Sequence, residues 1–357
     1  MFARKTKPVL TPNLIALGLI GLLFGACHSD SKDRPTPENT LIIYTGRDKD
    51  EVAAVVGLFT EKHPQYKGKV ETVILGAQAA LDRLRAEKSN PQAGFLWGGT
   101  LEGLQQAANE GLLAPSNPVN ANLIDVSRKD PQGRWFAEIL LPEVIVYNHE
   151  LLKPEEAPKD WDDLITPAFK GKLVIRDVMP SGTMRTIFSA MIYRQFAATG
   201  SVGSGFDWLK RLDANTAIYT PNPDDMYLKL DRGVGTVTLW NLQDALIQPL
   251  KNNRPWSYVM PTSGVPVLLD GVGVVSNPKV MKAAQEFEDF LLDPQLQLQL
   301  ARDYYQIPAM KVPDEGRPEW LARLHLQEMK LDWELMGHKQ KEWMDYWSQN
   351  IKGKGGR

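Results

Sequence analysis

The sequence predicts an α/β protein whose strands and helices alternate within two lobes. Short runs of β-branched and aromatic residues alternate with helical patterns between residues 41 and 111. A second set of similar units follows between residues 139 and 240. With 357 residues, 43% of them hydrophobic, the chain can fill two cores. Alternation with short turns favours parallel, doubly wound sheets.

The first set contains three strand–helix units. Its strands are expected at Leu41–Tyr44, Val70–Leu75 and Gly94–Trp97. Its helices are expected at Asp48–His63, at Ala77–Glu87 and from residue 101 through Glu110. In the first helix, apolar residues recur at helical spacing, which indicates a buried stripe. Gly111 follows the third helix and favours its termination.

The second set repeats this order, and longer helical patterns follow it. Strands are expected at Ile139–Asn148, Lys172–Arg176, Thr216–Tyr219, Thr236–Trp240, Ser257–Met260 and Val265–Val275. Helices are expected at Ser181–Gln195, Asp224–Arg232, Pro278–Tyr304 and, as a tail, Glu319–Ile351. The glycine-rich stretch Gly200–Gly205 is interpreted as a flexible connection between helices.

The N-terminus carries the features of an export signal. A positive segment with Arg4, Lys5 and Lys7 precedes the apolar run Leu14–Ala26, which is shorter than the roughly 20 residues that span a bilayer. Small residues then lead to the single cysteine, Cys27. This arrangement resembles a bacterial lipoprotein signal, which implies removal of residues 1–26, lipidation of Cys27 and a polar tether over residues 27–39. An ordinary signal peptide cleaved nearby, leaving a free thiol, is the alternative.

Composition excludes several functional classes. The formal net charge of −2 gives no electrostatic basis for nucleic-acid binding. One cysteine excludes an intramolecular disulfide and any site built from several cysteines. The sequence contains no HExxH zinc motif, no G-x-S-x-G elbow and no phosphate-binding loop of the Walker type. We therefore expect neither an enzyme nor a bound cofactor or metal.

The loops at the carboxyl ends of the predicted strands are the candidate binding positions. In a two-lobed α/β protein these ends face one crevice. The loops are Thr45–Asp48, Gly98–Thr100, Asp177–Thr183 and Asn241–Asp244. Three of them lead directly into helices, whose first amide groups bind anions. Each turn taken alone is weak evidence, and a lone Ser-Gly-Thr turn is more often a plain helix cap that binds nothing.

Four long segments resemble one protein family. They are LIIYTGRDKDEVAAVVGLFTEKHP (41–64), GFLWGGTLEGLQQAANEGLLAP (94–115), residues 144–183 and residues 264–308. They are similar to extracellular solute-binding proteins of the iron(III)/phosphonate/sugar-phosphate type, which serve ABC importers. The resemblance implies a type II periplasmic-binding fold, with two doubly wound lobes joined by two crossover strands. It places lobe 1 at 40–137 plus 258–315, lobe 2 at 138–257, and a tail at 316–357 that packs on the lobes.

The same resemblance assigns ligand positions. Ferric-binding members use a histidine, a glutamate and adjacent tyrosines, and the matching positions are Asp48, Gly99 and Leu242–Gln243, none of which keeps the iron pattern. Ferric iron needs several anionic oxygens, which Asp48 alone does not supply. Tyr219 and Tyr227 remain as phenol donors for a different iron geometry.

Anion-binding members instead use hydroxyls and amides at helix starts, with a guanidinium to neutralise charge. The matching ligand-binding candidates are Thr45, Arg47, Gly99, Thr100, Ser181, Gly182, Thr183, Arg185, Trp240, Asn241 and Asp270. Asn241, Asp244 and Asp270 suit hydroxyls or an amine, whereas Trp97 and Trp240 suit either sugar stacking or core packing.

These observations favour the substrate-binding component of an ABC importer. It would be a monomeric, membrane-anchored extracytoplasmic lipoprotein, in the periplasm or on the cell surface, that captures a small anionic solute and docks on permease subunits. A phosphonate or a sugar or organic phosphate is favoured over ferric iron. The alternatives are an extracytoplasmic phosphate-ester hydrolase and a sensor module that presents its ligand to a two-component system. Release of an intact ligand would exclude the hydrolase, and neighbouring permease and ATPase genes would exclude the sensor.

Overall fold

The fold was analysed in a computed structural model that describes residues 39–355. These described residues form one compact unit. The export signal, Cys27 and all of the tether except Asn39 lie outside the described residues. Within residues 39–355, no helix is both long and apolar enough to cross a membrane.

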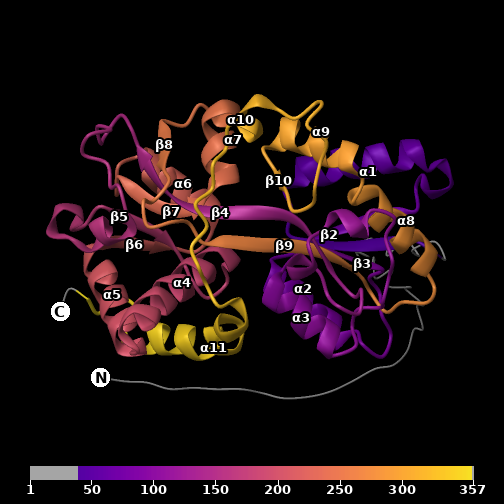
Figure 1. Cartoon of the computed structure of the whole chain (residues 1–357), viewed down its shortest axis with the longest axis horizontal. Helices are drawn as coiled ribbons and strands as arrows, with labels where there is room; N and C mark the ends of the chain where they lie inside the picture. The colour runs from indigo at the N-terminus through magenta and orange to yellow at the C-terminus, as the bar shows by residue number, and fades with distance from the viewer. Residues whose placement is uncertain (1–38, 356–357) are drawn as a thin grey trace, which may run out of the picture. The chain divides into compact units, whose positions relative to one another are not determined.

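A single mixed sheet runs through this unit (Figure 1). Its strands are β1 (Leu41–Thr45), β2 (Val70–Ile74), β3 (Phe95–Thr100), β4 (Phe136–Asn148), β5 (Leu173–Arg176), β6 (Thr216–Thr220), β7 (Val237–Asn241), β8 (Trp256–Val259), β9 (Val267–Val274) and β10 (Ile307–Pro308). The order is β2-β1-β3-β9-β4-β7-β5-β6, and β8 and β10 also pair with β4. Parallel pairing of β1 with β2 and β3, and of β5 with β6 and β7, confirms two doubly wound halves.

Strands β4 and β9 connect the two halves. The first part of β4, from Phe136 to Pro142, pairs antiparallel with β9. Its second part, from Glu143 to Asn148, pairs with β7 and β8. Strand β9 in turn pairs with β3. This confirms the two crossover strands, and the fold is that of a type II periplasmic-binding protein.

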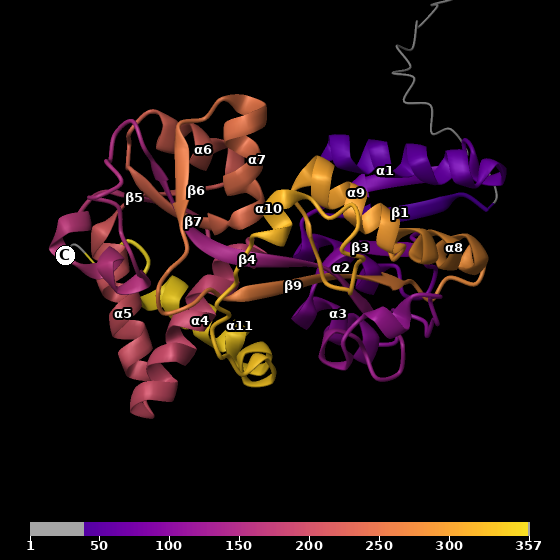
Figure 2. The same cartoon turned by 45° about the horizontal axis from the view of Figure 1, so that its top comes forward.

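Helices cover both sides of these crossover strands. They are α1 (Lys49–Lys62), α2 (Ala77–Ala86), α3 (Leu101–Asn109), α4 (Gly182–Thr199), α5 (Val202–Asn215), α6 (Pro223–Asp231), α7 (Leu242–Asn252), α8 (Met281–Leu291), α9 (Pro294–Tyr304), α10 (Glu319–Ala322) and α11 (Trp333–Asn350). In Figures 1 and 2, α1, α7 and α9 lie on one side of β4 and β9, whereas α3, α4 and α11 lie on the other.

The buried side chains form separate cores in the two halves. One core combines β4, β5, β7 and α4 with side chains of α11. Two further cores fill the other half, around α1 with α8 and around α2 with α3. Trp333 and Leu269 pack against both the α11 core and the α2–α3 core. These two side chains therefore link the halves.

Two helical predictions differ from the structure in the middle of the chain. The expected helix Pro278–Tyr304 is two helices, because Asp293 caps α9 with its carboxylate and Pro294 follows as the first helical residue. The expected flexible connection Gly200–Gly205 contains the start of α5. A Cβ at Gly205 would lie 2.6 Å from the Ile192 Cα, so this glycine lets α5 approach α4 closely.

The tail prediction is wrong over part of its length. Helix α10 has only four residues, and the chain then runs without helix to Asp332, where the carboxylate caps α11. This stretch pairs with Val265, whose amide donates to the Gln327 carbonyl at 2.9 Å and whose carbonyl accepts from the Met329 amide at 2.8 Å. Sheet-like pairing thus replaces the expected helix between α10 and α11.

Candidate functional site

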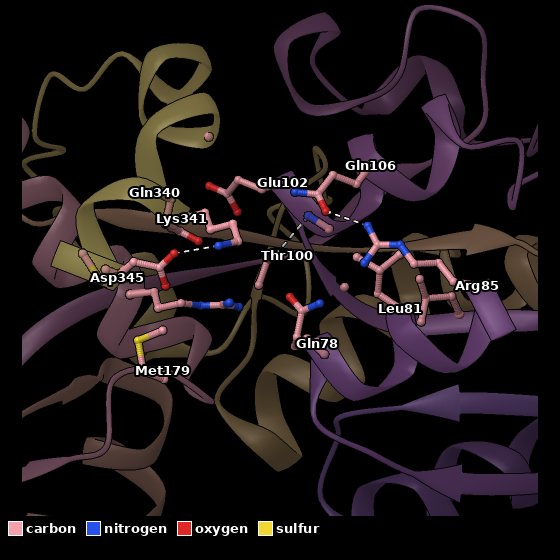
Figure 3. Close-up of a pocket in the computed structure, with 17 residues that line it drawn as sticks. Gln78, Leu81, Arg85, Thr100, Glu102, Gln106, Met179, Gln340, Lys341 and Asp345 are labelled. Atoms are coloured by element: carbon pink, nitrogen blue, oxygen red, sulfur yellow. Dashed lines mark hydrogen bonds and ion pairs between the residues drawn. The ribbon is translucent and has the colours of Figure 1, made fainter. Parts of the chain in front are cut away.

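A cavity of about 430 Å³ opens between α2, α3, the start of α4 and α11 (Figure 3). We call it the α3–α11 cavity. Its lining residues are Ala77, Gln78, Leu81, Arg85, Leu96, Gly99, Thr100, Glu102, Gly103, Gln106, Met179, Arg185, Gly337, Gln340, Lys341, Met344 and Asp345. Both its volume and its concave shape are typical of small-molecule sites.

Arg185 gives this cavity an unbalanced positive charge. Its guanidinium makes no hydrogen bond or ion pair with any residue between 39 and 355, and its Nε is buried without a partner. Burial lowers the pKa of Arg185, and attraction to Glu102 only partly opposes that shift. Because a guanidinium stays protonated at neutral pH, Arg185 is a partly desolvated cation that lacks a ligand.

Glu102 of α3 lines the same cavity and is only 7% exposed. Burial raises its pKa, although its own amide, Arg185 and Thr100 act in the opposite direction. Its Oε1 has no hydrogen-bond partner among the described residues. The cavity therefore also holds a carboxyl group that can pair with a hydroxyl or an amine.

The remaining charged side chains of the cavity are already paired. Arg85 binds Glu110 at 2.6 Å and donates to the Gln106 Oε1 at 2.9 Å. Lys341 pairs with Asp345 at 2.6 Å across one turn of α11. Figure 3 shows the Arg85–Gln106 and Lys341–Asp345 pairs on opposite walls of the cavity. Arg185 is thus the cation that remains available to an anion.

Two helix N-termini meet beside Arg185. Thr100 caps α3 by accepting from the Gly103 amide at 3.3 Å. Ser181 caps α4 by accepting from the Met184 amide at 3.2 Å, as the sequence predicts for a helix start. A Cβ on Gly182 would lie 3.1 Å from the Thr100 Cγ2, so the two helix starts touch. The amides of Gly182 and Thr183 are the first of α4 and have no intrahelical partner.

A second cavity of about 390 Å³ lies among α1, α6, α7 and α9, and we call it the acidic cavity. Its lining residues are Asp48, Asp50, Glu51, Asp224, Tyr227, Gln243, Asp244, Ile247, Gln248, Lys251, Asn252, Arg254 and Tyr304. Since α1 and α7 lie across the crossover strands from α3 and α11, the two cavities are on opposite sides of β4 and β9. The sequence predicts one crevice for all four loops, whereas the structure divides them between two cavities.

Arg47 lies between the cavities in a network of carboxylates. It binds Glu138 of β4 at 2.8 Å, Asp270 of β9 at 3.2 Å and Glu51 at 3.9 Å. Burial alone would lower the pKa of Arg47, but these three acids outweigh it and raise that pKa. Burial raises the pKa of Asp270 to about 6 and that of Glu51 to about 7, with Arg47 opposing both shifts. Arg47 therefore joins β1 to both crossover strands and has no free charge for a ligand.

The hydroxyl and indole candidates near this network are largely enclosed. The Thr45 Oγ1 accepts from the Arg47 amide at 3.1 Å, and its side chain is fully buried. Trp97 donates to Glu138 at 2.8 Å. Trp240 is 3% exposed, donates to Asp244 at 2.6 Å and carries the Arg176 guanidinium over its ring.

Asn241 likewise has hydrogen-bond partners within the protein, and Thr183 lies beside a buried acid. The Asn241 side chain caps α7 by accepting from the Asp244 amide at 2.8 Å, and it donates to the Asp244 carboxylate at 2.9 Å. Thr183 faces Glu143, a fully buried carboxyl whose pKa burial raises well above its usual range. Gly99 and Thr100, by contrast, line the α3–α11 cavity with Arg185.

The positions that correspond to iron ligands do not form a metal site. Leu242 is fully buried, and Gly99 has no donor side chain. Tyr219 donates to Asp213 at 2.6 Å and Tyr227 to Asp244 at 2.9 Å, while burial and these acids raise the pKa of both phenols. Among residues 39–355 no three His, Cys, Asp or Glu side chains are grouped to hold a metal ion.

Sequence reasoning missed one entire wall of the α3–α11 cavity. Gly337, Gln340 and Asp345 belong to α11, which the sequence analysis assigns to packing alone. Nothing in the sequence places α11 beside α3, since more than 200 residues separate them. Glu102 was also missed, although it is the second residue after the Gly98–Thr100 turn.

Comparison with known proteins is consistent with this architecture. The chain is 24% identical to "Probable ABC transporter periplasmic-binding protein y4fP" of Sinorhizobium fredii, over 89% of this chain and 87% of the relative. It is 25% identical to "Iron uptake protein A1" of Synechocystis, over 78% of each chain. Among solved structures it is similar to the periplasmic binding protein AfuA of Actinobacillus pleuropneumoniae with fructose-6-phosphate bound. That match has 25% identity and a TM-score of 0.74, and it covers 88% of this chain and 98% of AfuA.

A family model described as "Bacterial extracellular solute-binding protein" matches residues 102–328, which is more than half of the chain. These residues include α3 from its second residue, the start of α4 and both crossover strands. A solute-binding family agrees with the expectation that the chain is not an enzyme. By this match the chain belongs to the bacterial extracellular solute-binding protein family.

Proposed function

We propose that this protein is the monomeric substrate-binding component of an ABC importer and that its solute is a small phosphonate or organic phosphate. Membership of a solute-binding family supports the binding role. The name of the Sinorhizobium relative supports the link to an ABC transporter. The fructose-6-phosphate in the AfuA structure supports an anionic solute, whereas the name of the Synechocystis relative favours iron. The side chains of the site must therefore decide between the two ligands.

The single observation that carries the anion proposal is the unpaired guanidinium of Arg185. A desolvated cation without a partner costs free energy, which an oxyanion recovers through bidentate, charge-assisted hydrogen bonds. Thr100 and the start of α4 lie beside it and add a hydroxyl and helix amides, which also favour an anion. Glu102 and the carboxamides of the same cavity are suited to hydroxyls or an amine on the rest of the solute.

Iron is disfavoured by the donor set. Fe³⁺ is a hard cation that prefers several anionic oxygens. Asp48 is the one acid at the corresponding positions, and the Tyr227 phenol near it stays protonated because its pKa is raised. These residues support an anion in the α3–α11 cavity better than a metal in the acidic cavity.

Isothermal titration calorimetry of the purified chain tests this proposal. The probes are 2-aminoethylphosphonate, fructose 6-phosphate, inorganic phosphate and ferric citrate. We expect saturable binding of at least one organic phosphorus compound, and a loss of about 100-fold or more in Arg185→Gln because a buried charged pair is removed. Arg211→Gln, at an exposed position on α5, is the matched control and should bind as the parent does.

Either of two results would overturn the proposal. One is tight ferric binding that displaces every phosphorus probe. The other is affinity for the phosphorus probes that is identical in the Arg185→Gln and Arg211→Gln variants.

We further propose that Cys27 anchors the protein to its membrane through lipid. The apolar run that ends in small residues before Cys27 supports this assignment, and stable anchoring needs more than one acyl chain. Cys27→Ser should release the protein into the soluble fraction and abolish metabolic labelling with palmitate. A variant that stays membrane-bound and labelled would contradict the assignment.

A further inference from the structure

The inference concerns α11, the C-terminal helix that forms one wall of the α3–α11 cavity. It lies outside the segment matched by the family model, which ends at residue 328. Three features of α11 bear on its role: the half of the protein to which it is attached, the helix that it faces, and the side chains that it presents to the cavity.

Helix α11 is fixed to the half of the protein that contains α4. Met336, Trp343, Met344 and Trp347 are all buried in the same core as α4 and β7. The Trp347 ring packs edge-on against Phe188 of α4, with 5.3 Å between ring centroids. Helix α11 is therefore packed as part of the same half as α4.

The opposite face of α11 approaches α3 in the other half. A Cβ at Gly337 would lie 3.2 Å from the Glu102 Cγ, so the two helices are nearly in contact there. Trp333, at the start of α11, packs against cores of both halves. Because α3 belongs to one half and α11 to the other, a solute between these two helices would contact both halves.

On the α11 wall of the cavity, Gln340 is the polar side chain that has no hydrogen-bond partner among the described residues. It lines the cavity, and its carboxamide makes no hydrogen bond with any residue from 39 to 355. Gln78 and Gln106, on the opposite wall, are engaged by Asp82 and Arg85. A carboxamide with both its donor and its acceptor free can bind a hydroxyl, an amine or an anionic oxygen.

From these contacts we propose that α11 is a recognition element and that Gln340 determines specificity by binding the part of the solute farther from Arg185. Because Gly337 has no side chain, α11 can approach α3 closely beside that part of the solute. This inference rests on the proposed function, since it assumes that an anion occupies the cavity at Arg185. It goes further by assigning selectivity among such anions to a helix beyond the family segment.

The test compares large and small probes by calorimetry on full-length variants. Fructose 6-phosphate and 2-aminoethylphosphonate carry groups beyond the phosphorus, whereas inorganic phosphate does not. We expect Gln340→Ala to weaken the organic probe bound by the parent by at least 5-fold and to leave inorganic phosphate within 2-fold. Gln349→Ala is the matched control, because Gln349 is an exposed glutamine on the same helix outside the cavity. It should leave the affinity for every probe unchanged.

A second variant changes shape rather than polarity. Gly337→Leu adds a bulky side chain where α11 and α3 are already nearly in contact, so we expect at least 10-fold weaker binding of the organic probe. A role confined to holding the fold would instead lower the melting temperature and leave affinity unchanged.

Three results separate the inference from the function on which it rests. If Arg185→Gln loses binding while Gln340→Ala and Gly337→Leu bind as the parent does, the inference is wrong and the proposed function stands. If Gln340→Ala weakens inorganic phosphate as much as the organic probe, the role in specificity is wrong. If the parent binds none of the phosphorus probes, the proposed function fails and the inference fails with it.

Discussion

At the scale of single residues, two arginines have opposite electrostatic surroundings. Arg47 is enclosed by Glu51, Glu138 and Asp270, which more than neutralise it. Arg185 is partly buried beside the single acid Glu102 and forms no ion pair with any described residue. The first arginine holds strands together, and the second is available to a ligand.

This contrast predicts opposite effects on stability in the absence of ligand. Arg47→Gln leaves buried carboxylates without their cation and should lower the free energy of unfolding by about 3 kcal/mol. Arg185→Gln removes a charge that burial penalises, so its unfolding free energy should stay level or rise by up to about 1 kcal/mol. Urea denaturation of both variants measures this, and equal losses would contradict the assigned roles.

A second residue-scale prediction concerns Glu288 on α8, which is 1% exposed. Burial raises its pKa to about 8, with a hydrogen bond from Ser116 opposing and Asp289 adding to the shift. The folded protein therefore keeps a proton on Glu288 that the unfolded chain loses near pH 4.5. Protonated Glu288 makes its full contribution to the free energy of unfolding below pH 4.5. This contribution is lost as the pH rises through the Glu288 pKa of the folded protein, about 8.

Glu288→Gln should remove this pH dependence because the amide does not titrate. From pH 5 to pH 8, the free energy of unfolding of the variant should increase relative to that of the parent by on the order of 4 kcal/mol. Urea denaturation across this range is the measurement, and other titrating groups cancel in the difference. Parallel profiles for the two proteins would show that Glu288 is ionised throughout.

At the scale of secondary-structure elements, two glycines inside helices have different surroundings. A Cβ added at Gly57 in α1 would have no neighbouring atom within 4 Å, whereas a Cβ at Gly205 in α5 would meet the α4 backbone at Ile192. The first glycine costs helix stability without a packing benefit. The second permits close contact between α4 and α5.

Alanine at these two positions should therefore act in opposite directions. Gly57→Ala should raise the free energy of unfolding by about 0.5–1 kcal/mol through helix propensity. Gly205→Ala should lower it by about 1–3 kcal/mol, because the added methyl forces the helices apart. Thermal or urea unfolding of each variant checks this, and a stabilised Gly205→Ala would mean that α5 packs less closely on α4.

Sequence reasoning succeeded where the signal is local and failed where it depends on distant contacts. Hydrophobic periodicity located most strands and helices of both halves, and the Ser181–Thr183 helix start was found from its cap residues. Asp293–Pro294 is a local helix boundary that the periodic pattern of α8 and α9 obscured. Neither the neutralisation of Arg47 nor the position of α11 could be predicted, because both depend on residues far away in the chain.

At the scale of the whole described unit, the halves meet at the starts of α3 and α4. Gly182 contacts Thr100 there, so a side chain at residue 182 would separate the two helix starts. Binding proteins of this architecture work by closing around a ligand, which shifts an equilibrium between open and closed forms. The close approach of Gly182 and Thr100 therefore limits how far the two halves can close.

Gly182→Leu should hold the halves apart without disturbing either core. We expect a larger radius of gyration than the parent in small-angle scattering with saturating fructose 6-phosphate, and at least 10-fold weaker binding in calorimetry. The leucine is at the first turn of α4, where ordinary helical geometry accepts it. An unchanged affinity and radius would show that the two helix starts do not approach further when ligand binds.

The central claim is that an organic phosphorus anion binds in the α3–α11 cavity through Arg185. A crystal structure of the protein with fructose 6-phosphate tests this most directly. The account predicts the phosphate within hydrogen-bond distance of the Arg185 guanidinium and of Thr100 or the first amides of α4, with the sugar beside Gln340. A phosphate in the acidic cavity beside Asp48 and Asp244, or a metal ion there with an empty α3–α11 cavity, would contradict it.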